Sequence, residues 1–202
     1  MIAIIDYGIG NLFSLQSSFS EIGENAVVTS DVSAIEMADR IILPGVGAFE
    51  DAAEKLRESG LDKVVCSQAE SGKPIMGICL GMQMLFEKSY EYGEHCGLGL
   101  LKGSVVSMEG RLPSELKIPH IGWNSLSVKK EHPIFKYTKD GDFVYFVHSY
   151  YADGVGESLL ATAEYGREIT AAVALGNVSG TQFHPEKSGE AGLRILRAFA
   201  EW

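Results

Sequence analysis

Short apolar runs alternate with amphipathic stretches through the first half of the chain. Residues 2–6 form a nearly continuous apolar run, which predicts a buried strand, and apolar residues then recur at helical spacing from 12 to 22. The same alternation predicts strands at 26–29, 40–43 and 75–78, and helices at 48–58, 61–71 and 80–88. Apolar strands separated by helices are typical of a parallel sheet covered on both faces.

The second half has a different pattern. Short segments rich in Val, Tyr, Phe and Thr, broken by Gly or Asp, predict antiparallel or mixed strands at 99–108, 123–129, 143–151, 159–165 and 170–175. A closing helix is predicted from about Ser188, and no repeat or linker divides the chain. We therefore expect one α/β domain, residues 1–202. It should have a doubly wound, mostly parallel sheet with helices on both faces, and an added antiparallel or mixed β layer.

Composition narrows the function classes. A chain of 202 residues is long enough for one well-packed core, and a net charge of −10 argues against non-specific nucleic-acid binding. The sequence shows neither a long apolar run nor a basic leader, so we expect a cytoplasmic protein. Cys66, Cys79 and Cys96 lack the CxxC spacing of a zinc site or a disulfide framework.

A cysteine stands at the predicted junction of a strand and a helix. Gly77 and Gly81 flank Cys79 at two positions either side, which is the cysteine counterpart of the Gly-x-Ser-x-Gly nucleophile elbow. Such a turn strains the backbone of its middle residue and needs glycines beside it. The amino end of the following helix favours the thiolate. Cys79 is therefore a candidate nucleophile.

A base for this thiol lies about a hundred residues later. His184 is the candidate general base, Pro185 fixes the direction of the chain, and Glu186 is placed to orient the imidazole through Nδ1. Together with Cys79 they have the nucleophile, base and acid roles of a catalytic triad.

The predicted strands bring further groups to the same edge. Asp6, Pro44-Gly45 and Cys79 each stand at the carboxyl end of a predicted parallel strand, and ligands collect beyond such ends. The segment Pro44 to Phe49 could be only a tight turn. Beside a nucleophile, the N–H groups of Val46, Gly47 and Leu80 are candidates for an oxyanion hole.

Other polar residues have two interpretations. Gln83 lies one helical turn after Cys79, yet alone it would most often be a surface residue. Glu91 could be a solvated acid, and the segment 148–151 could be a half-buried edge. His95, His120 and His132 show no partner pattern and are interpreted as structural or surface residues.

The combined motifs resemble those of the class I (triad) glutamine amidotransferases. Within this class the chain is most similar to the glutaminase subunits of imidazole glycerol phosphate synthases, which act in histidine biosynthesis. The elbow and the triad segment are common to the class, and the segments 6–12, 44–49 and 119–124 narrow the choice to these subunits. The resemblance spans essentially the whole chain and rests on the segments 6–12, 44–49, 77–83, 119–124, 146–150 and 182–188.

The resemblance implies a reaction. Cys79 would attack the side-chain amide of glutamine and form a thioester, with His184 as proton acceptor and donor and Glu186 orienting it. Ammonia leaves as the thioester forms, hydrolysis of the thioester then gives glutamate, and neither a metal nor an organic cofactor is needed. By the same resemblance, the residues that hold glutamine are Gln83, Glu91, Ser149 and Tyr150.

The resemblance also implies a partner. A (β/α)₈-barrel cyclase subunit would form a heterodimer with the chain and use the ammonia to make imidazole glycerol phosphate and an aminoimidazole-carboxamide ribonucleotide. In this chain, the positions that match the family's docking face for the cyclase are Asn11, Trp123, Tyr145 and Lys187. Trp123 is large and rigid enough for an interface hot spot, and core packing is the alternative. A peptide flip at Gly45-Val46-Gly47 is our hypothesis for coupling the subunits.

Three other functions remain open at this point. One is a glutaminase subunit of another synthase, such as those that make pyridoxal phosphate or anthranilate. The second is a cysteine peptidase or chaperone-like hydrolase, although neither predicts the His-Pro-Glu segment. The third is a regulatory subunit without turnover, which the presence of all three triad residue types disfavours.

Overall fold

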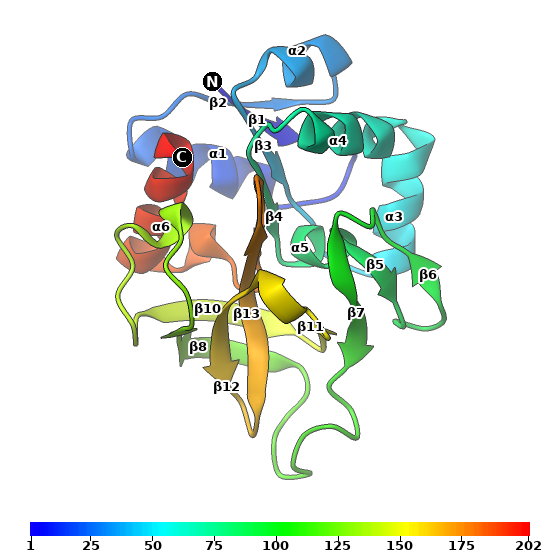
Figure 1. Cartoon of the computed structure of the whole chain (residues 1–202), viewed down its shortest axis with the longest axis vertical. Coiled ribbons are helices and arrows are strands. Elements are labelled where there is room, and N and C mark those ends of the chain that lie inside the picture. The colour runs from blue at the N-terminus through cyan, green and yellow to red at the C-terminus, as the bar shows by residue number, and fades with distance from the viewer.

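An eight-stranded sheet runs through the centre of the computed structural model, which describes residues 1–202 (Figure 1). The strand order is β2-β1-β3-β4-β14-β13-β12-β9. The parallel part contains β1 (Ile2–Ile5), β2 (Ala26–Thr29), β3 (Arg40–Leu43), β4 (Ile75–Ile78) and β14 (Val178–Thr181). The antiparallel part adds β13 (Glu168–Leu175), β12 (Leu159–Glu164) and β9 (Ser127–Val128).

Helices cover both faces of this sheet. One face carries α1 (Leu12–Glu21) and α6 (Gly189–Glu201), and the other carries α2 (Val32–Met37), α3 (Phe49–Glu58) and α4 (Leu61–Glu70) (Figure 1). The short helix α5 (Leu80–Met84) follows β4 directly. No helix is both long and apolar enough to cross a membrane. The predicted fold class is confirmed.

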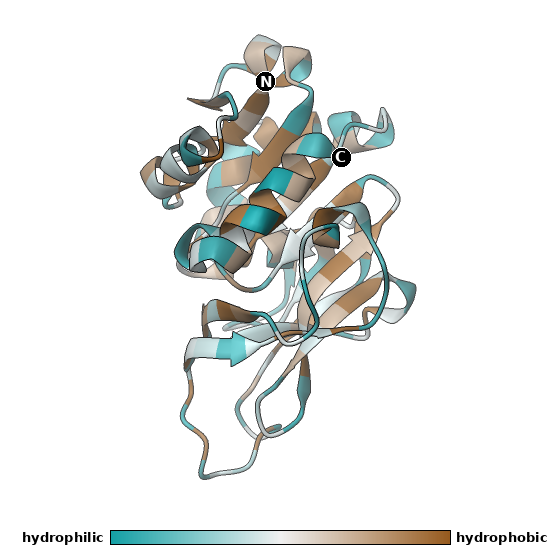
Figure 2. Ribbon diagram, turned by 90° about the vertical axis from the view of Figure 1, so that its left-hand side faces the viewer, coloured by the Kyte–Doolittle hydropathy of each residue, from teal (hydrophilic) through white to brown (hydrophobic).

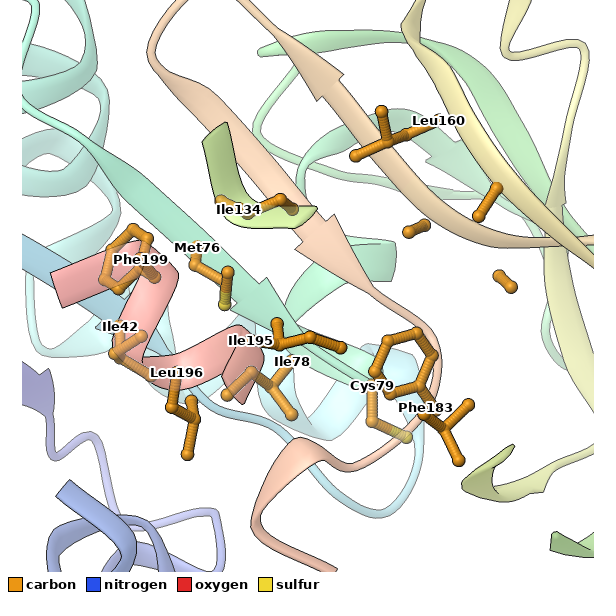
Figure 3. Close-up of a cluster of buried hydrophobic side chains, with 14 of the residues drawn as sticks. Ile42, Met76, Ile78, Cys79, Ile134, Leu160, Phe183, Ile195, Leu196 and Phe199 are labelled. Atoms are coloured by element: carbon orange, nitrogen blue, oxygen red, sulfur yellow. The ribbon is translucent and has the colours of Figure 1, made fainter. Parts of the chain in front are cut away.

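Alternation along the buried strands produces two separate cores. Ile2 and Ile4 of β1 join the core beneath α1 and α6, whereas Ala3 and Ile5 join the core beneath the other helices. The central strands are largely hydrophobic, while the helices carry both kinds of residue (Figure 2). Figure 3 shows part of the first core, whose labelled residues include Ile42, Met76, Ile78, Ile195, Leu196 and Phe199.

Two smaller sheets form the predicted added β layer. One pairs β8 (His120–Ser125) with β10 (Phe143–His148). The other has the order β11-β7-β5-β6, with bounds Tyr150–Asp153, Leu101–Ser107, Phe86–Ser89 and His95–Cys96. Three 3₁₀ turns complete the chain: η1 (Pro133–Phe135), η2 (Gly156–Ser158) and η3 (Pro185–Lys187).

The helix predicted at 80–88 is wrong beyond Met84. Residues Phe86–Ser89 form β5, which pairs in parallel with β7. This pairing joins segments distant in sequence, and such contacts override a short helical pattern.

The single strands predicted at 123–129 and 143–151 are each two strands in different sheets. The chain changes sheet at Leu126 in the first case and at Ser149 in the second. The elements α2, β6 and β14 were not predicted. Of these, β14 matters most, because it lies beside β4 and leads to His184.

Candidate active site

The carboxyl ends of the parallel strands meet at one edge of the sheet. Asp6 follows β1, Pro44 follows β3, and Cys79 follows β4. The neighbouring strand β14 ends at Thr181, three residues before His184. Parallel pairing of β1, β3, β4 and β14 therefore places all these segments on the side where α/β sheets bind ligands.

Cys79 occupies a strained turn between β4 and α5. Its φ is 54° and its ψ is −113°, in a region that residues with side chains rarely adopt. A Cβ added at Gly81 would lie 1.9 Å from the Leu43 oxygen, and one at Gly77 would lie 2.6 Å from the Gly81 oxygen. Gly81 is therefore needed for the close packing of the elbow against β3, and Gly77 for the close packing of β4 against α5.

Two hydrogen bonds fix the position of the base. The N–H of His184 donates to the Tyr145 oxygen at 3.0 Å, and the Ser188 hydroxyl donates to the His184 oxygen at 2.6 Å. The same hydroxyl accepts from the Tyr145 N–H at 2.9 Å. The segment from His184 to Ser188 is therefore bound to β10 at both backbone polar atoms of Tyr145.

His184 contacts both other triad candidates. Its Nδ1 lies 2.8 Å from Oε1 of Glu186, and these two side chains are only 3% and 1% exposed. Burial alone lowers the pKa of His184, but side-chain hydrogen bonds to Cys79 and Glu186 outweigh it and raise the pKa to about 10. The imidazole is therefore protonated at neutral pH and can give a proton to a leaving group. The other carboxylate oxygen of Glu186 is buried without a hydrogen-bond partner.

A cavity of about 330 Å³ opens in front of Cys79 and His184. It gathers the candidate oxyanion and glutamine-binding residues of the sequence analysis, while Glu186 lies behind His184 and does not line it. The lining residues are Val46, Gly47, Cys79, Leu80, Gln83, Glu91, Tyr92, Pro119, Val147, His148, Ser149, Tyr150 and His184.

The candidate oxyanion hole lies where α5 begins. Leu80 is the first residue of α5, so its N–H has no partner within the helix. In the turn that packs against Leu80 through Gly45, Gly47 has a φ of +91°, and a Cβ built there would meet no atom within 4 Å. The peptide between Val46 and Gly47 therefore has conformational freedom and open space beside the nucleophile.

The turn that contains Val46 and Gly47 is held at both ends. The Tyr7 hydroxyl donates to the Pro44 oxygen at 2.7 Å, and the Phe49 N–H donates to Oε2 of Glu91 at 2.8 Å. Burial, and then the charge of Cys79, raise the pKa of Tyr7 well above its ordinary value, so the hydroxyl stays a donor. Burial also raises the pKa of Glu91, partly opposed by the Phe49 hydrogen bond.

Gln83 is buried, not a surface residue. Its Nε2 donates to the Tyr150 oxygen at 3.0 Å and to Oε1 of Gln182 at 2.9 Å. Both hydrogens of this amide nitrogen are therefore used within the protein. Only the Gln83 carbonyl oxygen is left to contact a ligand, and it can only accept a hydrogen bond.

The four candidate interface residues lie outside the cavity. Trp123 and Tyr145 are paired across β8 and β10, and their rings meet edge to face with centroids 6.2 Å apart. Trp123 is 54% exposed, so it is not a core residue. Asn11 precedes α1 and Lys187 ends η3. We call the outward side of β8 and β10 the docking face; its side chains are Ile121, Trp123, Phe143 and Tyr145.

Sequence reasoning missed two buried polar residues, His148 and Gln182. His148 lines the cavity, and its Nδ1 lies 2.8 Å from the Tyr150 oxygen. Its Nε2 lies 3.2 Å from Nδ1 of His120, which is also buried. Alternate residues of β10 point inward at Val144, Phe146 and His148, and this period of two is a signal in the sequence that could have identified His148.

The two histidines are held neutral by their surroundings. Burial lowers the pKa of His148 to about 3, with the nearby charge of His184 as a further contribution, and lowers the pKa of His120 to about 4. His120 stacks between Phe146 and Tyr165, with ring centroids at 4.8 and 4.0 Å. Neutral His148 can donate through Nδ1 to Tyr150 and accept through Nε2 from His120.

The sequence model of the family "Glutamine amidotransferase class-I" matches residues 3–201 of the chain. The chain belongs to this family. The geometry around Cys79 is thus that of a candidate active site in a class-I glutamine amidotransferase.

Curated relatives of this amidotransferase cover its whole length. "Imidazole glycerol phosphate synthase subunit HisH" of Oceanobacillus iheyensis is 50% identical over 202 residues, covering 100% of this chain and 98% of the relative. The subunit of the same name from Caldanaerobacter subterraneus is 52% identical with the same coverage. That of Methanosarcina acetivorans is 52% identical over 203 residues, covering 99% of this chain and 98% of the relative.

Solved structures share the fold of this amidotransferase at lower identity. A crystal structure of a glutamine amidotransferase superposes with a TM-score of 0.78 at 21% identity, covering 100% of this chain and 98% of the other. PurLQS from Thermotoga maritima gives a TM-score of 0.75 at 24% identity, with coverage of 99% and 97%. These likenesses show the fold alone.

Proposed function

We propose that this amidotransferase is the glutaminase subunit of imidazole glycerol phosphate synthase and acts in histidine biosynthesis. The main support is the identity of about 50% over the full length to subunits that carry this name. In this proposal residues 1–202 form a single amidotransferase domain, which the match at residues 3–201 supports. A cytoplasmic location stays a prediction from the sequence.

The proposed reaction uses Cys79 as nucleophile. The thiolate attacks the side-chain amide carbon of glutamine, and protonated His184 gives its proton to the departing ammonia. His184 then accepts a proton from the water that attacks the thioester, so that glutamate leaves and the thiolate returns. The short contact between His184 and Glu186, both buried, supports an orienting role for Glu186.

The proposed oxyanion hole combines donors from two neighbouring segments of the cavity lining. The free N–H of Leu80 supplies one, and the Val46–Gly47 peptide supplies the other when it points inward. Gly47 can adopt either orientation of this peptide at low energetic cost. A partner that sets this orientation would couple glutamine hydrolysis to its own reaction.

The far end of the cavity suits the amino-acid head group of glutamine. Glu91 offers a carboxylate for the α-ammonium group, and the Gln83 carbonyl oxygen can accept from the same group. Ser149 and Tyr150 also line the cavity, where the chain passes from β10 to β11, and the Tyr150 carbonyl oxygen lies 3.0 Å from Nε2 of Gln83. Their backbone is the proposed site for the α-carboxylate.

We propose a heterodimer in which a (β/α)₈-barrel cyclase subunit consumes the ammonia. The docking face supports an interface because it exposes aromatic and aliphatic side chains on a regular two-stranded sheet. Asn11 and Lys187 would add polar contacts at its edge. The proposed products of the partner are imidazole glycerol phosphate and an aminoimidazole-carboxamide ribonucleotide.

The test is glutamate release from glutamine by the purified chain, alone and with the cyclase carrying its ribonucleotide ligand. We expect little release alone and a large increase with the liganded partner, and none in either case from Cys79→Ala. Release that does not respond to this cyclase, but responds to another synthase, would overturn the assignment to histidine biosynthesis. Cleavage of casein without glutamine hydrolysis would overturn the amidotransferase reaction itself.

A further inference from the structure

Gln182 is a buried amide beside the nucleophile that the triad does not include. It follows β14 directly, two residues before His184, and is 0% exposed. Its Nε2 lies 3.8 Å from Sγ of Cys79, within the range of an N–H···S hydrogen bond. A buried amide placed against a sulfur atom can stabilise negative charge on that atom.

A backbone atom determines which end of this amide faces the sulfur. The Tyr150 carbonyl oxygen can only accept, so the Gln83 atom 3.0 Å away must be the donor Nε2. The second hydrogen of that nitrogen is directed at Gln182, 2.9 Å away, where the atom must be the acceptor Oε1. The Gln182 atom that faces Cys79 is therefore Nε2, which can only donate.

The Tyr150 carbonyl, which sets this orientation, is itself held in place. The Tyr150 oxygen accepts from Gln83 and also from Nδ1 of His148, which lies 2.8 Å away. Both lone pairs of that oxygen are thus occupied. The orientation of Gln182 therefore follows from a chain of hydrogen bonds. The chain starts at the Tyr150 carbonyl oxygen, which accepts two hydrogen bonds, and ends at the sulfur of Cys79.

We propose that Gln182 is a further catalytic residue, which donates a hydrogen bond from Nε2 to the thiolate of Cys79, with Gln83 as its positioning residue. The proposal rests on the role of Cys79 as nucleophile in the proposed function. Gln182 stabilises the sulfur whenever it carries negative charge. This occurs before the S–C bond to glutamine forms, and again when the thioester C–S bond breaks and its electron pair returns to sulfur.

The test is the pH dependence of Cys79 alkylation by iodoacetamide, in a chain whose Cys66 and Cys96 are replaced by Ser. A hydrogen bond to a charged group shifts a pKa by about one unit or more, so Gln182→Leu should raise the apparent thiol pKa by about one unit. Gln182→Glu should raise it further, because a carboxylate oxygen then faces the thiolate. With the liganded partner, glutamine kcat/KM should fall about 10- to 100-fold.

Gln16→Glu is the matched control, because Gln16 on α1 donates to the Ala26 oxygen of β2 and not to the sulfur. It makes the same amide-to-carboxylate change and should leave the alkylation profile unchanged. Gln83→Leu leaves Gln182 in place but removes its orienting contact, so it should give a smaller rise. Gln83→Leu also provides the test of the proposal if Gln182→Leu does not fold.

Equal apparent pKa values in the parent, Gln182→Glu and Gln83→Leu chains would overturn the proposal. The alkylation measurement requires no glutamine turnover. Failure of the parent chain to hydrolyse glutamine with its partner would therefore count against the proposed function alone, while the alkylation profiles would still decide the role of Gln182.

Discussion

The Tyr7 hydroxyl donates a 2.7 Å hydrogen bond to the carbonyl oxygen of Pro44, at the residue where the candidate oxyanion turn begins. The other end of this turn is held by the contact between Phe49 and Glu91. Movement is therefore confined to the few residues between the two contacts. A change at Tyr7 should act on catalysis through the turn, since Tyr7 does not line the cavity.

We expect Tyr7→Phe to leave the buried Pro44 oxygen without its partner. The loss should lower the free energy of unfolding by about 1–3 kcal/mol, measured by urea denaturation. Glutamine hydrolysis with the liganded partner should show a reduced kcat and a nearly unchanged KM, because the turn and not the head-group site is loosened. A change confined to KM would contradict this account.

Cys79→Ala should reduce glutamine-dependent product formation on the order of 10⁴-fold or more, since no other group can form the thioester. Activity with added ammonium salts should be retained, because free ammonia enters the reaction at the partner. The measurement is product formation by the reconstituted pair with either nitrogen source. Loss of both activities would indicate a structural role of Cys79 in the complex.

Glu186→Gln should be milder than Cys79→Ala, because an orienting group contributes less than the nucleophile. His184→Asn should be nearly as severe as Cys79→Ala.

The carboxylate of Glu186 helps to raise the pKa of His184 to about 10, so its removal should lower that pKa. The alkaline limb of the pH profile for glutamine hydrolysis should then move to lower pH, because the imidazolium that protonates ammonia is lost earlier. An unmoved limb would contradict the orienting contact.

The buried histidine pair should make the fold sensitive to acid. The pKa values of about 4 for His120 and about 3 for His148 lie below the ordinary 6.5, so below pH 6.5 the unfolded chain takes up protons that the folded chain does not. Stability should therefore be fully present above pH 6.5 and fall as the pH decreases toward 3.

The matched variant is His120→Phe, which keeps the stacking between Phe146 and Tyr165 and removes one titrating group. Its free energy of unfolding should change less between pH 6.5 and 4 than that of the parent chain. Urea denaturation across this range measures the slope. A steeper dependence in the variant would show that the protonation of His120 does not oppose folding.

Trp123→Ala should weaken binding of the cyclase subunit by about 30-fold, as for a central aromatic anchor, with little change in the stability of the free chain. Met37→Ala is the control, because Met37 is 74% exposed on α2, at the opposite end of the molecule from β8 (Figure 1). Isothermal titration calorimetry gives both affinities. Equal losses for the two variants would place the interface elsewhere.

The sequence predicted those parts of the site that depend on local backbone. The strands at 26–29, 40–43 and 75–78 have the predicted bounds, because each is a buried apolar run with turn residues at its end. Cys79 and His184 stand in short motifs whose geometry is set within a few residues. The catalytic roles assigned to them stay predictions.

The rest depends on contacts between distant segments. Gln182 reaches Cys79 only because β14 pairs with β4, and that pairing joins residues about a hundred positions apart. The strand Phe86–Ser89 was predicted as helix for the same reason, since its partner β7 comes later in the chain. The exposure of Trp123 and the burial of Gln83 likewise follow from packing, which a local pattern does not contain.

The backbone contacts of Tyr145 constrain how the protein can evolve. Its N–H and carbonyl oxygen are both bound by the segment from His184 to Ser188, while its side chain belongs to the docking face. In the proposed heterodimer, partner recognition and the placement of His184 therefore share one short stretch of main chain. A substitution that improves subunit affinity by shifting β10 will also displace the imidazole, so selection for tight assembly and selection for fast turnover act on the same atoms.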